Sequence, residues 1–217
     1  MTFAELKKLV QKGEGLFTEF KRKANHPDKI MKEVVAFANT HGGKLLIGVD
    51  DDGTIAGLKY ANEDEFELRK AIEVYCKPSV KYQVTKVLIA TNRSVLVFDI
   101  LPSTEKPVFL IYNFKKNTGV AYIRVADQSL QASREMRKIL QGTTQNQDTV
   151  FMYTQKEQIL LQYIAKNTRI DVQTFATIAN IPMHDASDIL VRLTLSKVLQ
   201  IQAEEMKDWF TEIGAEK

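Results

Sequence analysis

The sequence predicts an α+β fold, in which a mixed β-sheet is packed by helices and followed by a small winged-helix domain. The length of 217 residues suits one large domain or two small ones. Apolar residues recur at helical and at strand spacing in turn over the first 140 residues. A polar stretch without this periodicity follows. We therefore expect a first domain over 1–140, a linker over 141–150 and a second domain over 151–217.

The first domain is expected to begin with a short helix. Thr2 and Glu5 form a capping-box pattern, because each side chain can accept a hydrogen bond from an unpaired amide at a helix start. Residues 16–23 are expected to be extended. A second helix is predicted from Pro27 to Asn39, where proline suits the first turn and two glycines follow the end.

A short apolar strand is predicted next, over Lys44–Asp50. Asp52-Gly53 is a hairpin turn signal, so Thr54–Leu58 is expected to be the returning strand. Asn62 is expected to cap a third helix. The remaining elements are four strands near 80–89, 94–101, 107–112 and 119–125, and a helix over about 131–140.

The second domain is predicted from three helical patterns, near 155–166, 171–179 and 184–196, with a strand over 198–202. Three short helices followed by a strand are typical of a winged helix-turn-helix. The last predicted helix carries Asp185 and Asp188 against Arg192, a balance that is unusual for a helix that reads the major groove. The alternative interpretation is a unit that dimerises or binds a partner.

The net charge is distributed unevenly. Residues 1–149 carry 23 basic and 18 acidic side chains, a net charge of +5, whereas residues 150–217 carry 7 and 9, a net charge of −2. We therefore expect the two parts to have different partners. The single cysteine, Cys76, excludes an intrachain disulfide and fits a reducing compartment. No apolar run is long enough to span a membrane and the N-terminus has no signal-peptide pattern, so we expect a cytoplasmic protein.

Three motifs are the most distinctive features. Glu14-Gly-Leu-Phe-Thr-Glu-Phe-Lys21 is followed by Ala36-Phe-Ala-Asn-Thr-His-Gly-Gly43 and by Leu46-Ile-Gly-Val-Asp-Asp-Asp-Gly53. Further along come Pro107, Ala121-Tyr-Ile-Arg-Val125 and Ser129 through Ala132. In order and spacing, these segments over about residues 13–140 resemble the Schlafen/AlbA-like domain family.

The resemblance implies a nucleic-acid-binding function. Bacterial members look like DNA-binding regulators, often with a C-terminal winged helix, so it implies a transcriptional regulator that binds DNA in preference to RNA. It also implies a homodimer, because two copies could rebuild the groove that two related lobes form in the animal proteins. Gly42-Gly43-Lys44 is followed by Leu45, so the phosphate-binding loop of an ATPase is not expected.

An enzyme is the alternative that the resemblance leaves open. Some animal Schlafen proteins are metal-dependent endoribonucleases, and their three acidic residues match Glu14, Glu19 and Asp51. These carboxylates are the candidate catalytic residues and ligands for Mg²⁺ or Mn²⁺. Glu14 and Glu19 are five residues apart, so they can share a site only if the chain bends, for which Gly15 is suited although the family usually has serine there. Without the family, the run from Asp50 to Gly53 reads equally as a solvated turn.

Basic residues near these motifs are the candidate nucleic-acid contacts. They are Lys21, Arg22, Lys23, Lys44, Lys115, Lys116 and Arg124. Such cations can follow phosphates and make the affinity depend on salt. Few aromatic residues lie among them in the sequence, so stacking on single-stranded bases is not the expected mode. A third hypothesis, a non-catalytic protein-interaction or dimerisation module, rests on the acidity of the C-terminal part.

Overall fold

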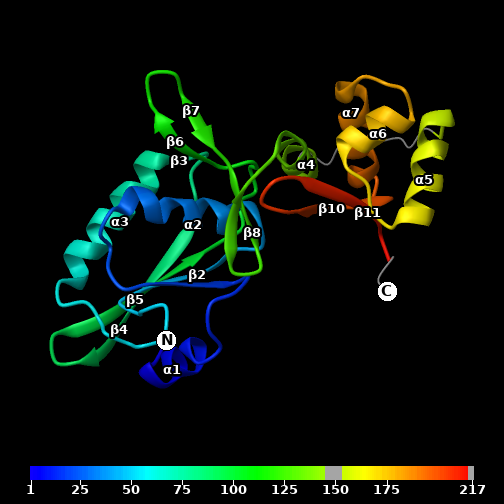
Figure 1. The fold of residues 1–217 in the computed structure, drawn as a ribbon. Helices are drawn as coiled ribbons and strands as arrows, with labels where there is room; N and C mark the ends of the chain where they lie inside the picture. Colours follow the sequence, from blue (N-terminus) through cyan, green and yellow to red (C-terminus); the bar gives the residue numbers. More distant parts are fainter. Residues whose placement is uncertain (145–152, 215–217) are drawn as a thin grey trace. The chain divides into compact units, whose positions relative to one another are not determined.

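The computed structural model describes residues 1–144 and 153–214 (Figure 1). The chain divides into two compact units, Met1–Gln131 (unit 1) and Ala132–Lys217 (unit 2). The helix α4 (Arg134–Thr144) extends over the first four residues of the predicted linker. It belongs to unit 2, because it packs on the helix α7 (Met183–Leu195). Residues 145–150 of the predicted linker lie outside the described residues.

A four-stranded mixed sheet is the centre of unit 1, and the α+β class is confirmed. The sheet consists of β1 (Thr18–Lys21), β2 (Gly43–Ile47), β5 (Arg93–Ile100) and β4 (Tyr82–Ala90), in that spatial order. β1 and β2 are parallel and are joined through a helix, whereas β5 pairs antiparallel with both of its neighbours. The equivalent ends of β1 and β2 therefore meet at one edge of the sheet.

Helices cover both faces of this sheet (Figure 1). The predicted helix α2 (Pro27–Asn39) is confirmed, and it packs on one face together with α3 (Ala61–Tyr75). The opposite face is covered by α1 (Phe3–Val10), which begins with the predicted capping box. Side chains alternate along β2: Leu45 and Ile47 belong to the core under α2, whereas Leu46 belongs to the core under α1.

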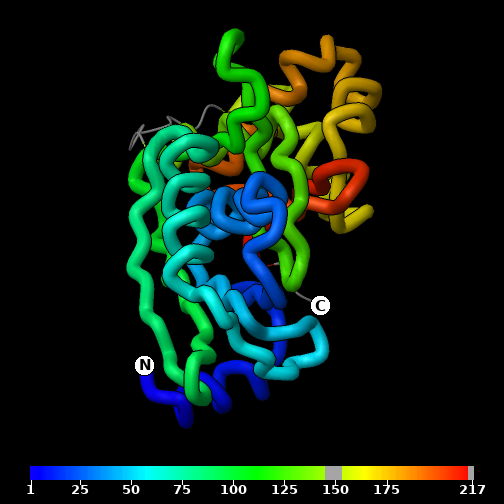
Figure 2. The backbone as a smooth tube through the Cα atoms, turned by 90° about the vertical axis from the view of Figure 1, so that its left-hand side faces the viewer, coloured from blue at the N-terminus to red at the C-terminus, as the bar shows by residue number. Residues whose placement is uncertain are grey.

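Short strands complete unit 1. One sheet contains β3 (Cys76–Lys77), β6 (Phe109–Asn113) and β7 (Thr118–Val120), and a hairpin contains β8 (Tyr122–Val125) and β9 (Gln128–Gln131). Figure 2 shows the β6–β7 hairpin projecting from the body of unit 1. The buried side chain of Asn39 links α2 to the segments before β6 and at β8. Its amide donates to the carbonyl oxygens of Val108 and Tyr122, and its oxygen accepts from the Val108 N–H.

The strand predicted near 119–125 is divided into β7 and β8, which belong to different sheets. Two further predictions, for residues 54–62, are wrong. The returning strand predicted over Thr54–Leu58 does not form, and only isolated bridges connect Val49 to Ile55 and Leu58 to Ser94. Gly57, at a φ of +67°, interrupts the extended backbone there. Asn62 does not cap α3, which begins one residue earlier; its side chain instead accepts a hydrogen bond from Lys86.

Unit 2 contains α4, α5 (Gln155–Asn167), α6 (Val172–Ile178) and α7, followed by the antiparallel strands β10 (Leu199–Ala203) and β11 (Asp208–Glu212). Its core includes the fully buried Leu160, Phe175, Leu190 and Phe210. The sequence did not predict β11, which carries Phe210. Among the described residues, none of the helices is long and apolar enough to cross a membrane.

Candidate nucleic-acid interface

The chain bends between Glu14 and Glu19, as a shared site requires. The Gly15 N–H donates to the Thr18 carbonyl oxygen at 3.0 Å, and the Thr18 N–H donates to the Gly15 carbonyl oxygen at 3.4 Å. This turn places Glu14 beside β1, where its carboxylate accepts a hydrogen bond from the Phe20 N–H at 2.7 Å. Burial raises the pKa of Glu14, and the charges of Glu19 and Asp51 add to this effect, although the Phe20 hydrogen bond opposes it.

Glu19 is the centre of a buried ion-pair network. The Arg124 guanidinium donates to one Glu19 oxygen at 2.7 Å, and Lys21 forms an ion pair with the other. Arg124 also donates to Glu33 at 3.1 Å and to the carbonyl oxygens of Gly15 and Thr18. The guanidinium therefore fastens the bend, β1 and α2 together.

Arg124 requires a correction to the predicted interface. Its side chain is only 1% exposed, so it cannot follow phosphates from the surface. Glu33, which the sequence prediction missed, is the second carboxylate of the network and is also buried. The sequence does contain a pattern that indicates a buried Glu33, because this residue lies on the apolar stripe of α2, three residues after Ile30 and four before Phe37. A lone carboxylate in such a stripe needs a buried cation.

The three predicted metal ligands do not fit a divalent cation in this arrangement. Both oxygens of Glu19 are already held by side-chain cations, and Glu14 accepts from a backbone amide. Asp51 is exposed on the turn after β2. Within residues 1–144 and 153–214, no group of three or more His, Cys, Asp or Glu side chains is placed to hold a metal ion.

A basic pocket lies beside this network, at the end of β1 and the start of α2. We call it the lysine pocket, after Lys21, Lys23, Lys29 and Lys32, which line it. Its volume is about 620 Å³. The other side chains of its wall come from the β1–α2 loop, from α2, from β6 and from β8. They are Asn25, His26, Asp28, Ile30, Glu33, Leu110 and Tyr122.

The lysines of the pocket differ in their partners. Burial alone lowers the pKa of Lys21, but the hydrogen bond and charge of Glu19, together with Glu33, outweigh it and raise the pKa. Lys21 therefore stays protonated, but it is engaged by carboxylates. Within the described part of the chain, the side-chain ammonium groups of Lys23, Lys29 and Lys32 have no hydrogen bond or ion pair.

The position of the lysine pocket favours an anionic ligand. The positive end of the α2 dipole points to it, and no side chain caps the first turn of that helix. Lys29 and Lys32 are three residues apart, so they share one face of α2. Asp28 is the one carboxylate of this first turn. The sequence prediction missed Lys29 and Lys32, although their spacing beside Lys21 and Lys23 was a usable signal.

The other predicted cations lie elsewhere in unit 1. Arg22 is exposed and pairs with Asp50 at 3.3 Å. Lys44 pairs with Asp99 at the start of β2, the strand end opposite to the lysine pocket. Lys115 and Lys116 are exposed at the tip of the β6–β7 hairpin. The structure thus brings Lys21 and Lys23 together, but not the whole predicted set.

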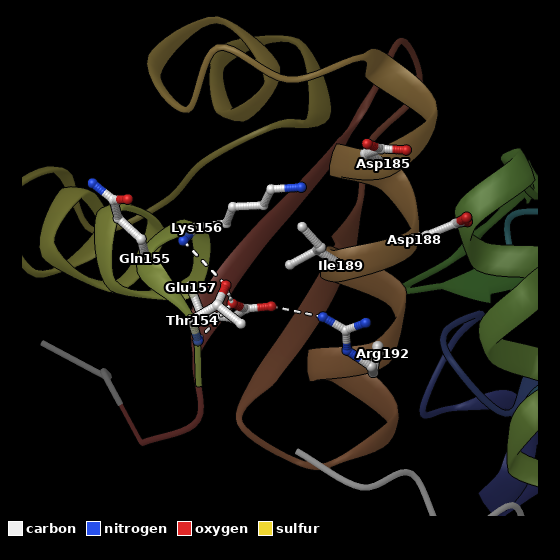
Figure 3. Close-up of a pocket in the computed structure, with 8 residues that line it drawn as sticks. All are labelled: Thr154, Gln155, Lys156, Glu157, Asp185, Asp188, Ile189 and Arg192. Atoms are coloured by element: carbon white, nitrogen blue, oxygen red, sulfur yellow. Dashed lines mark hydrogen bonds and ion pairs between the residues drawn. The ribbon is translucent and has the colours of Figure 1, made fainter. Parts of the chain in front are cut away.

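Unit 2 contains a second pocket, of about 550 Å³, between the start of α5 and α7 (Figure 3). Its floor is an ion pair, because Glu157, only 1% exposed, accepts from Arg192 at 2.6 Å. Burial alone raises the pKa of Glu157, but hydrogen bonds from Thr154 and the charge of Arg192 lower it overall. Asp185 and Asp188 also line this pocket. This carboxylate-rich wall suits a phosphate less well than the lysine pocket does.

The chain is similar to a known protein family and to two solved structures. The family model described as "Schlafen, AlbA_2" matches residues 14–133. No curated protein gives a significant match. One similar solved structure is the N-terminal domain of a putative ATP-dependent DNA helicase RecG-related protein from Nitrosomonas europaea, at 24% identity and a TM-score of 0.43 over 58% of this chain and 89% of that chain. Another is the DIP2311 protein from Corynebacterium diphtheriae, at 21% identity and a TM-score of 0.37 over 58% of this chain and 21% of that chain.

Proposed function

Since this chain belongs to the Schlafen AlbA_2 family, whose model matches more than half of its length, we propose that it is a nucleic-acid-binding protein. Its lysine pocket holds backbone phosphates. The observation that carries this proposal is the set of three lysines, Lys23, Lys29 and Lys32, that surround one pocket without an ion-pair partner in the described residues. Unneutralised cations of this kind supply most of the sequence-independent affinity for nucleic acid.

The buried ion pairs prevent the carboxylates beside the pocket from neutralising its outer lysines. Glu19 and Glu33 are compensated by Arg124 and Lys21 inside the protein. The outer lysines are therefore left to interact with a ligand. A polyanion is the matching partner, because the excess positive charge of the chain belongs to residues 1–149. Metal-dependent cleavage is not part of the proposal, because the oxygens of Glu19 are already engaged.

The finer role that we propose is a DNA-binding transcriptional regulator that acts as a homodimer. The order of three helices and a β-hairpin in unit 2 supports a winged helix. At the hairpin, the Trp209 ring has Arg169 and Lys207 over it, at 4.1 and 4.0 Å from its centroid, and these two cations are paired with Glu204 and Asp171. Asp185 and Asp188 lie in the first turns of α7. Unit 2 therefore contributes dimer contacts and contacts from its hairpin, while unit 1 supplies the main phosphate-binding surface.

The test is a comparison of two charge-matched variants of the full chain. In one, Lys23, Lys29 and Lys32 are replaced by glutamine. In the control, three exposed lysines of unit 1 outside the pocket, Lys8, Lys12 and Lys70, are replaced in the same way. Binding of labelled duplex and single-stranded DNA and RNA is measured by fluorescence anisotropy over a range of salt concentrations.

We expect the pocket variant to bind about tenfold or more weakly at moderate salt, and its slope of log K against log salt to decrease by about two to three. The control variant should retain most of the affinity. Absence of binding by the unmodified protein at low salt would overturn the proposed function. Equal losses in both variants would show a diffuse charge effect and would remove the lysine pocket from it. Light scattering tests the homodimer, and a monomeric mass at micromolar concentration would contradict it.

A further inference from the structure

The tip of the β6–β7 hairpin combines exposed aromatic side chains with lysines. Tyr112 is 66% exposed and Phe114 is 56% exposed, and both precede Lys115 and Lys116. Single exposed hydrophobic residues are common on protein surfaces, so the distinguishing feature of this tip is the combination of two neighbouring rings with two lysines. In the sequence these residues are far from the acidic motifs, so their relation to the lysine pocket becomes visible only in the fold.

The two aromatic rings are in different situations. The Phe114 ring packs against Tyr75 of α3, with the ring centroids 5.7 Å apart. The Tyr112 side chain has no ring contact, cation contact or hydrogen bond to any residue that the structure describes. The pairing of β6 with β7 shifts its register between Ile111 and Asn113, so Tyr112 lies in a bulge. Bulges commonly redirect a side chain out of the sheet.

The conformation of the hairpin loop is stabilised by contacts within the loop itself. The Lys116 N–H donates to the Asn113 side chain at 3.0 Å, and Asn117 takes a left-handed conformation with a φ of +49°. In the described residues, neither Lys115 nor Lys116 has an ion-pair partner. The loop therefore presents two free charges beside an uncovered aromatic ring.

The same strand connects this ring to the lysine pocket. Leu110 of β6 lines the pocket, and Tyr112 follows two residues later, about 7 Å further along the strand. Cations thus lie on both sides of Tyr112: the pocket lysines before it, and Lys115 and Lys116 after it. A chain that carries phosphates at short intervals can contact both groups of lysines while a base reaches the ring.

We propose that Tyr112 is a stacking platform for a base of single-stranded nucleic acid whose backbone passes from the lysine pocket to the hairpin tip. The proposal rests on the nucleic-acid-binding function proposed above and specifies its ligand. An exposed ring can stack on a base only where the base faces are free, and a duplex hides them. The flanking lysines favour a polyanion over an apolar protein surface as the occupant.

The experiment uses the full chain and short oligonucleotides of single-stranded DNA, of single-stranded RNA and of duplex DNA of equal length. The variants are Tyr112→Ala, Tyr112→Phe and, as a control, Phe66→Ala, since Phe66 is an exposed aromatic residue of α3 with 64% exposure. Binding is followed by anisotropy. Stacking is followed separately, by quenching of a fluorescent purine analogue placed at successive positions of the oligonucleotide.

We expect Tyr112→Ala to weaken single-strand binding by about fivefold or more and to abolish the quenching. Tyr112→Phe, which keeps the ring, should retain both, and Phe66→Ala and the duplex affinity should be unchanged. The tighter of the DNA and RNA single strands then identifies the natural source of the ligand.

Two outcomes would overturn the proposal while leaving the proposed function intact. One is lysine-dependent binding that Tyr112→Ala does not alter, and the other is an equal loss of duplex and single-strand affinity in that variant. If the unmodified protein binds none of the oligonucleotides at low salt, the proposed function itself fails, and the stacking proposal fails with it.

Discussion

Replacement of Arg124 by methionine tests the buried network directly. The substitution keeps an unbranched side chain of similar length but removes the guanidinium, which contacts Glu19, Glu33 and Ser129 as well as two backbone carbonyl oxygens. Glu19 keeps its ion pair with Lys21 after this change. Among the described residues, Glu33 then keeps one hydrogen-bond donor, the Ser129 hydroxyl, and no ion pair, so a nearly uncompensated charge remains buried.

The expected loss follows from that difference. Removal of one partner from a buried ion pair typically costs about 3–5 kcal/mol, because the remaining charge is left desolvated. Here Glu33 is the group that loses its cation, and two carbonyl oxygens also lose a donor. We therefore expect Arg124→Met to lower the free energy of unfolding of unit 1 by about 3–5 kcal/mol. In the double variant with Glu33→Gln, part of this loss should be recovered, because the buried charge is gone.

Urea unfolding at neutral pH, followed by two probes, measures the effect. Far-UV circular dichroism reports on both units, whereas the single tryptophan, Trp209, belongs to unit 2 and reports on that unit. The shift should be larger by circular dichroism than by Trp209 fluorescence. The control is Arg69→Met, which removes an exposed pair with Glu65 on α3 and should cost less than about 1 kcal/mol.

A loss below about 1 kcal/mol for Arg124→Met would refute the reasoning, because the network would then contribute no more than a surface ion pair. If the variant does not fold at all, Glu33→Gln alone provides the measurement. It leaves Arg124 paired with Glu19 and should destabilise unit 1 by less than Arg124→Met does. An equal or greater loss would contradict the assignment of Glu33 as the dependent partner.

Three further outcomes are expected. Burial raises the pKa of the Cys76 thiol to about 12, so a thiol reagent at pH 8 should react with it only as fast as the protein unfolds; rapid reaction in the folded state would disprove this burial. Burial also raises the pKa of Glu14, so the stability that its protonated form contributes is full below the unfolded pKa and is lost as pH rises through the folded pKa. Glu14→Gln should therefore raise the free energy of unfolding at pH 7, by less than about 1 kcal/mol. Denaturation midpoints measured against pH should show this stabilisation vanishing near pH 3. Excess EDTA should change nucleic-acid affinity by less than about twofold, because lysines rather than a metal ion hold the phosphates; a large loss in anisotropy titrations would restore the metal hypothesis.

Local patterns predicted most of the elements of the fold. The helix α2 was predicted with both of its ends, because proline at its start, a continuous apolar stripe and two following glycines all indicate the same bounds. The segment Thr54–Leu58 failed because its turn signal is local, whereas the strand it should have formed is interrupted at Gly57. The strand β11 was missed because its pairing with β10 is a tertiary feature that the tail sequence does not reveal.

The candidate site was predicted less completely. The acidic motif and Lys21 and Lys23 could be found from spacing, because they follow one another along the chain. Arg124 was assigned to the surface because a sequence cannot show which of its charges will be buried. Its distance in sequence from Glu19 is 105 residues, and only the fold brings the two together.

The acidic motif and the lysine pocket are best understood as parts of one arrangement. β1 and β2 are parallel, so the lysines after β1 and the aspartates after β2 lie at the same end of the sheet. The bend before β1 turns Glu14 back along this strand, where its carboxylate accepts from the Phe20 N–H. The carboxylates that are buried there must be neutralised, and Arg124 and Lys21 neutralise them from within. Each internal pair cancels its own field, so the potential at the surface is set by the cations that have no such partner. The carboxylates of this motif therefore act by holding the bend and the strand in place, and the ligand preference follows from the lysines outside them.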